Sequence, residues 1–66
     1  MQIYLNGQAH ECEATTTLTA LLAKAGHGDR RVAVEVNREI VPRSRHHEHV
    51  LHEGDRVEIV HAIGGG

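Results

Sequence analysis

One short helical segment, in a chain that otherwise reads as strands, is the feature that most constrains the fold. Apolar residues recur there at the i, i+3, i+4, i+7 spacing of one helical face, namely Leu18, Leu21, Leu22 and Ala25. Thr17 is the best candidate for the N-cap, and Gly26 is well placed to end the helix in a left-handed conformation. A helix of about two and a half turns does not persist alone in water. We therefore expect it to pack on a sheet formed by the rest of the chain.

The N-terminal residues predict a β-hairpin. Apolar and more polar residues alternate over the first five positions, which is the period of a half-buried strand. Asn6-Gly7 follows and strongly favours a two-residue hairpin turn, because both residues tolerate positive φ. We expect the return strand over residues 8–13, with Ala9 and Cys12 contributing to the core.

Two further strands are expected after the helix. Residues 32–36 are β-branched at alternate positions, and residues 39–41 form a short strand after a turn at Asn37-Arg38. The charged, histidine-rich residues 43–49 predict an irregular or short helical connection over the edge of the sheet.

The last strand is expected over residues 56–62. Its alternation places Val57 and Ile59 on one face and Val60 and Ala62 on the other.

These elements, in the order ββαβββ, predict an α+β fold. We expect a small mixed sheet of about five strands with one main helix packed on one face, because a two-layer arrangement lets a single helix cover one side. The other face stays open and carries Tyr4, Val60 and Ala62. Exposed apolar residues on a small sheet indicate a docking surface for a partner.

The small size of the chain limits what it can do alone. A chain of 66 residues buries only about 60% of its unfolded surface, and its stability is expected to be roughly 3–10 kcal/mol. That supports one domain with a small core, and leaves no room for a deep active-site cleft or a cofactor pocket. We therefore expect this chain to act as a substrate, carrier or binding module rather than as an enzyme.

Charge and cysteine content narrow the class of protein further. Seven Lys and Arg residues against nine Asp and Glu residues give a formal net charge of −2. Nucleic-acid binding is disfavoured because no basic surface is available to phosphates. A single cysteine excludes an internal disulfide, and neither a signal peptide nor an apolar run of membrane-spanning length is evident. We expect a cytoplasmic domain with no nucleic-acid or membrane partner.

A cluster of four histidines invites a metal-site interpretation: His46, His47, His49 and His52. Structural zinc sites commonly contain paired cysteines, and the single cysteine, Cys12, lies in another predicted strand. We expect this segment to be a solvated connector without a dedicated metal site, and adventitious binding of nickel or zinc stays open. Cys12 is expected to be a small core or sheet residue, because acidic neighbours on both sides do not favour a reactive thiolate.

The three final glycines are the feature most typical of chemistry. Gly64, Gly65 and Gly66 carry no Cβ, so such a tail can enter a narrow channel of a partner enzyme in any backbone conformation. It also leaves the terminal carboxylate unshielded. The alternative is a frayed terminus without a function.

Short motifs spread over the chain form a recognisable set. They are the opening MQI with the turn Asn6-Gly7, the helix start TL with LL at 21–22, VEVNREIVPR at 34–43, EGDRVEI at 53–59 and the terminal Gly65-Gly66. In this combination the chain resembles the ThiS family of small ubiquitin-like sulfur carriers of thiamine biosynthesis. The resemblance covers essentially the whole chain, and Gly64 adds a third glycine to the tail. It implies a β-grasp domain over residues 1–63 and a flexible glycine tail over residues 64–66.

The resemblance also implies a role as co-substrate. The carboxylate of Gly66 would be adenylated by a ThiF-type enzyme and converted to a thiocarboxylate with sulfur that a cysteine desulfurase or sulfurtransferase supplies. Thiazole synthase (ThiG) would then consume that sulfur with 1-deoxy-D-xylulose 5-phosphate and a glycine-derived imine. ATP and magnesium would be used by the adenylating partner, with no cofactor bound by this chain. Gly64 and Gly65 would thread into the partner active sites, while Val60, Ala62 and Tyr4 would dock.

Two other interpretations remain open at this point. A sulfur carrier of another pathway, such as a MoaD-like subunit of molybdopterin synthase, would share the tail chemistry, although such chains are usually longer. A TGS-type β-grasp interaction module would share the turn motifs, but has no reason to end in Gly-Gly.

Overall fold

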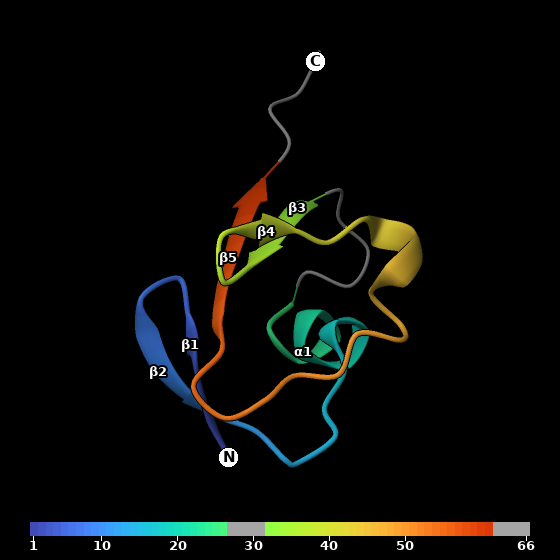
Figure 1. Ribbon diagram of the computed structural model, residues 1–66. Helices are drawn as coiled ribbons and strands as arrows, with labels where there is room; N and C mark the ends of the chain where they lie inside the picture. Colours follow the sequence, from blue (N-terminus) through green and yellow to red (C-terminus); the bar gives the residue numbers. More distant parts are fainter. Residues whose placement is uncertain (27–31, 62–66) are drawn as a thin grey trace.

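The computed structural model describes residues 1–26 and 32–61. The described elements are β1 (Gln2–Leu5), β2 (Gln8–Glu11), α1 (Leu18–Lys24), β3 (Val32–Val36), β4 (Glu39–Ile40), the 3₁₀ helix η1 (Arg43–Arg45) and β5 (Arg56–His61). The strands form one sheet in the order β2-β1-β5-β3-β4, in which β1 and β5 are parallel and the other neighbours are antiparallel (Figure 1). The predicted five-stranded mixed sheet with one main helix is confirmed.

The helix begins and ends where its sequence predicts. The Thr17 hydroxyl oxygen accepts a hydrogen bond from the Ala20 amide at 3.2 Å, which satisfies one of the amides that a helix start leaves without a partner. Beyond Lys24, Gly26 adopts a φ of +86°, the left-handed conformation expected of a residue that ends a helix.

Two further amides at the start of α1 are satisfied by the connection between β4 and β5. Leu18 N–H donates to the His49 carbonyl at 3.0 Å, and Thr19 N–H donates to the His46 carbonyl at 3.2 Å. This segment therefore caps the helix with its backbone, and its 3₁₀ helix confirms the predicted short helical connection.

His46 contradicts the prediction of a fully solvated histidine connector. Its side chain is only 5% exposed, and its Nε2 donates to the Val41 carbonyl at 2.9 Å. Histidine provides this bond together with apolar ring surface. The sequence pattern could not identify this residue, because the contact depends on how residues 43–49 fold back over the sheet edge.

The N-terminal hairpin has the predicted turn, but the side chain of Ala9 in its second strand lies on the other side of the sheet from the one predicted. Asn6 and Gly7 have φ values of 50° and 83°, as a two-residue turn requires. β2 ends at Glu11, and Ala9 is exposed, so the prediction that Ala9 joins the core is wrong. The reason is the register, which places Ala9 opposite the exposed Tyr4.

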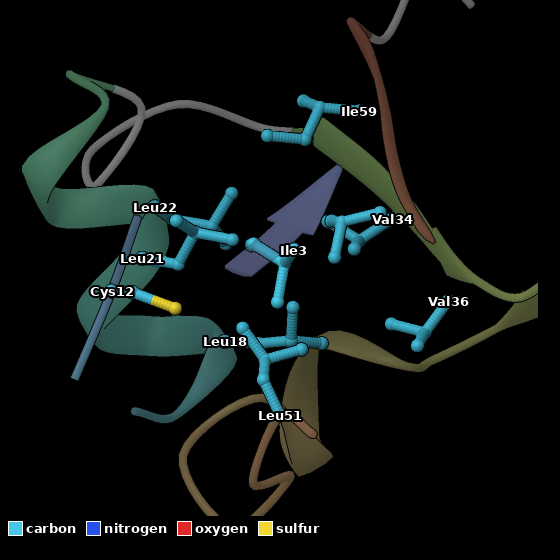
Figure 2. Packing of buried hydrophobic residues seen from close by; sticks show 10 residues of the cluster. Ile3, Cys12, Leu18, Leu21, Leu22, Val34, Val36, Leu51 and Ile59 are labelled. Carbon is cyan, nitrogen blue, oxygen red and sulfur yellow. The ribbon is translucent and has the colours of Figure 1, made fainter. Parts of the chain in front are cut away.

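The core lies between α1 and one face of the sheet, and its members among the described residues fall between residues 3 and 59. Figure 2 shows the leucines of α1 pointing toward side chains of the strands. The members are Ile3, Cys12, Leu18, Leu21, Leu22, Val34, Val36, Leu51, Val57 and Ile59. Burial of Cys12, Val57 and Ile59 confirms the predictions made for these residues. Burying this apolar surface against the sheet stabilises a helix too short to form by itself.

Candidate functional site

The face of the sheet opposite α1 is the candidate docking surface. Of the residues predicted to lie there, Tyr4 and Val60 are described, and both are exposed. Ala62, Gly64, Gly65 and Gly66 lie outside the described residues.

The strand register determines which side chains share this open face. Tyr4 on β1 lies opposite Arg56 on β5, and alternation along β5 puts Glu58 and Val60 on the same side as Arg56. Val60 in turn lies opposite Ala33 on β3. Tyr4 and Val60 therefore belong to one surface, although they are far apart in the sequence.

Exposed apolar side chains gather on this face. Tyr4 is 38% exposed, Val60 55% and Ile40 71%, and they are three of the four exposed large hydrophobic residues in the described part of the chain. The fourth, Val50, lies beside Thr17 near the start of the helix. Such a concentration on one face of a small protein is typical of an interaction surface.

Ile40 is a member of this face that the sequence analysis did not single out. It lies opposite Glu35 across the β3–β4 turn, and so shares the open face with Val60. The predicted two-residue turn at Asn37-Arg38 was sufficient to place Ile40 opposite Glu35, because a tight hairpin turn determines which residues of its two strands are paired.

Charged side chains complete the open face. The Arg56 guanidinium carbon lies 5.9 Å from the centroid of the Tyr4 ring, within the range of a cation–π interaction. A pocket of about 250 Å³ between β1 and β5 is lined by Tyr4, Gly7, Arg56 and Glu58. Glu35 on β3 lies directly opposite Glu58 on β5.

A hydrogen-bond network fastens the β3–β4 turn to the start of β5. Asn37 Nδ2 donates to Asp55 Oδ1 at 3.0 Å, and Asn37 Oδ1 accepts from the Arg56 amide at 3.0 Å. Asp55 Oδ2 accepts from the His52 amide at 2.8 Å. This network positions the backbone of Arg56. It also shows that Asn37 and Asp55, which belong to two of the sequence motifs, stabilise the fold.

Asn6 makes a comparable link at the other side of β5. Its side-chain Oδ1 accepts from the Ile59 amide at 2.8 Å, while its own amide donates to the Val57 carbonyl at 2.8 Å. Side chains on both sides of β5 therefore hydrogen-bond to its backbone, and these bonds fix the position of the strand within the open face.

The histidines do not assemble with other potential ligands. In residues 1–26 and 32–61, no three His, Cys, Asp or Glu side chains lie close enough together to hold a metal ion. His46 faces the interior, whereas His47 and His52 are exposed and His49 is half-buried. None of the helices in those two stretches is long and apolar enough to cross a membrane.

An open groove of about 420 Å³ lies beside β4 and η1. Its lining includes Val36, Val41 and Pro42 together with Arg45 and Glu48, which form an ion pair at 3.7 Å. These paired surface charges stabilise a connection, and they do not form a catalytic constellation.

Comparison with known proteins identifies close relatives over the whole chain. The sequence model of the ThiS family matches residues 3–66. The sulfur carrier protein ThiS of Escherichia coli is 35% identical over 66 residues, which is all of this chain and all of that protein. A thiazole synthase of Magnetococcus marinus is 48% identical over the same 66 residues, and this chain spans only 20% of its length. The crystal structure of the thiamine biosynthesis protein ThiS from Geobacter metallireducens superposes with a TM-score of 0.87 at 28% identity, covering all of both chains, so the fold is the β-grasp of ThiS.

Proposed function

Because this chain belongs to the ThiS family, we propose that it is a sulfur carrier protein of thiamine biosynthesis that carries sulfur on the carboxylate of Gly66. The observation that carries the proposal is the match of the family over residues 3–66. The correspondence with ThiS of Escherichia coli along the full length of both chains supports the same role.

The proposed chemistry proceeds in two displacement steps at Gly66. First, a carboxylate oxygen attacks the α-phosphorus of ATP, and pyrophosphate leaves. Second, a sulfur nucleophile at the oxidation level of sulfide attacks the carbonyl carbon, and AMP leaves, so that a thiocarboxylate remains. Forming the acyl-adenylate divides one difficult substitution into two easier ones.

In this proposal the partners provide the reactive groups, and this chain provides a terminus and a surface. A ThiF-type enzyme would bind ATP and magnesium. A cysteine desulfurase or sulfurtransferase would provide the sulfur as a persulfide, from which a thiol reductant releases sulfide while it is itself oxidised to a disulfide. Gly64 and Gly65 would pass through the partner's channel without side chains to obstruct it. Tyr4, Val60 and Ala62 would contact the partner surface beside that channel.

Thiazole synthase is the sulfur acceptor we propose. The relative from Magnetococcus marinus is named a thiazole synthase, and one fifth of its length matches this chain at 48% identity. Presence of a carrier-like segment in such a protein supports a joint action of carrier and synthase. It favours the thiamine pathway over the molybdopterin pathway as the destination of the sulfur.

Mass spectrometry of the purified chain tests the proposal. With ATP, magnesium, a ThiF-type enzyme, a cysteine desulfurase, cysteine and a thiol reductant, we expect the mass to rise by one exchange of oxygen for sulfur at the C-terminus. The matched control is a chain that lacks Gly66, which should gain no sulfur but unfold at the same temperature, because the core formed by the described residues lies between Ile3 and Ile59. An unchanged mass of the full chain with enzymes that load another ThiS would contradict the proposal.

A further inference from the structure

Two carboxylates face each other on the open face of the sheet. Glu35 on β3 and Glu58 on β5 are directly opposite in the antiparallel register. Like charges at such positions destabilise a sheet. Within residues 1–26 and 32–61, neither carboxylate forms an ion pair, and the guanidinium of Arg56 lies over the Tyr4 ring instead. The strand register thus places two like charges beside each other at this site.

The pair has two exposed apolar neighbours, and Arg56 lies two residues before Glu58 on the same face. Ile40 lies opposite Glu35 on one side, and Val60 follows Glu58 at the next position on the same face of β5. Ile40 and Val60 are 71% and 55% exposed. A carboxylate pair between apolar side chains favours a partner with a cation among apolar groups, because the charges would then be paired on burial.

We propose that Glu35 and Glu58 together receive an arginine or lysine of thiazole synthase when the open face docks on that enzyme. The inference rests on the proposed function, and it names residues that determine the specificity of the partner contact. A cation between the two carboxylates would turn their repulsion into attraction and give the complex its orientation. Ile40 and Val60 would pack around the ion pair and exclude water.

The charge of this face argues against a second copy of the chain as the occupant. In a two-fold symmetric pair, the same patch occurs on both sides of the interface. Among residues 1–26 and 32–61, the strands place the carboxylates of Glu35 and Glu58 and the guanidinium of Arg56 on this face, and the whole chain has a formal net charge of −2. Self-association would therefore bring carboxylates together, whereas a basic partner would neutralise them.

The position of the pair is compatible with delivery of the tail. Gly66 follows Val60 by six residues (66 − 60), and an extended chain spans at most about 3.6 Å per residue, so Gly66 can reach no further than about 22 Å from Val60. Any enzyme that reacts with Gly66 must consequently place protein surface close to the end of β5. Glu58 lies two residues before Val60 on the same face.

The test is the affinity of the full chain for the thiazole synthase of the same organism, measured by titration calorimetry at low and high ionic strength. We expect Glu35→Gln and Glu58→Gln each to weaken binding on the order of tenfold at low ionic strength. Glu58→Asp, which keeps the charge, should recover most of the loss. The control is Glu39→Gln, which removes a carboxylate opposite the buried Val36 and hence from the other face; it should bind within about twofold of the wild type.

Thermal unfolding of the same variants separates binding from folding. Removing one of two repelling charges should leave Tm equal to or above that of the wild type, so weaker binding would not result from a damaged fold. Equal binding by Glu35→Gln, Glu58→Gln and wild type would overturn the inference, as would an equal loss in Glu39→Gln. Sedimentation that shows a wild-type dimer strengthened by these substitutions would assign the face to a second copy, and would also overturn it.

Failure of this inference is distinguishable from failure of the proposed function. If the variants bind like the wild type but all gain sulfur at Gly66, only the proposed cation contact is wrong. If the wild type gains no sulfur with competent enzymes, the carrier function itself is wrong, whatever the affinities are.

Discussion

Replacement of Asn37 tests whether this residue of the segment 34–43 contributes to the free energy of unfolding. Asn37 has a φ of 52°, and its side chain makes two hydrogen bonds of 3.0 Å, to Asp55 and to the Arg56 amide. Both bonds are exposed, so together they are worth about 1–2 kcal/mol. Alanine in the left-handed conformation costs roughly 1–2 kcal/mol more. Asn37→Ala should therefore lower the free energy of unfolding by about 2–4 kcal/mol, from a total of roughly 3–10 kcal/mol.

Asn37→Gly separates the backbone contribution from the hydrogen bonds. Glycine loses the same two bonds and tolerates the positive φ, but its freer unfolded chain costs about 0.5–1 kcal/mol. We expect its stability to lie between those of the wild type and Asn37→Ala. Urea unfolding followed by far-UV circular dichroism is the suitable assay, because the chain contains no tryptophan. Ser44→Ala in the exposed part of η1 is the control. If Asn37→Ala stays within about 0.5 kcal/mol of the wild type, or is more stable than Asn37→Gly, the reasoning is refuted.

Two further substitutions examine the start of α1. Thr17→Ala removes the acceptor of the Ala20 amide and should lower the free energy of unfolding in urea by about 1 kcal/mol. The control is Thr19→Ala, at an exposed position in the same turn, which should lower it less. Equal losses of stability in the two variants would argue against the cap. His46→Leu removes the donor to the Val41 carbonyl and should cost about 1–3 kcal/mol, while His46→Gln, which keeps a donor, should cost less. Hydrogen exchange should report faster exchange at the Leu18 and Thr19 amides in His46→Leu, and unchanged rates there would contradict the capping role of this segment.

Features governed by neighbours in the sequence were predictable. The cap at Thr17, the turn at Asn6-Gly7 and the strand Val32–Val36 depend on residues within a few positions, and the structure contains all three. The facing of Val60 and Tyr4 followed from alternation along their strands. Local side-chain and backbone preferences are sufficient at such positions.

Features that depend on long-range contacts were not predictable in the same way. Ala9 is apolar, as core residues usually are, but the hairpin register places it opposite Tyr4 on the open face. His46 resembles its solvated neighbours in sequence, and only the path of the chain past Val41 buries it. The opposition of Glu35 and Glu58 required the pairing of β3 with β5, two strands separated by the whole connection. Pairing between distant strands is decided by the packing of the whole core rather than by local pattern.

The central position of β5 affects how the protein can be made. β5 is the last strand in the sequence, yet it lies between β1 and β3 (Figure 1). A nascent chain that stops before Arg56 contains two separate strand pairs, and isolated two-stranded hairpins are marginal in water. Formation of the whole sheet therefore requires that synthesis has passed β5, and chains that stop before Arg56 remain open to proteolysis. The order of the strands thus makes the stability of the earlier strands depend on the arrival of β5.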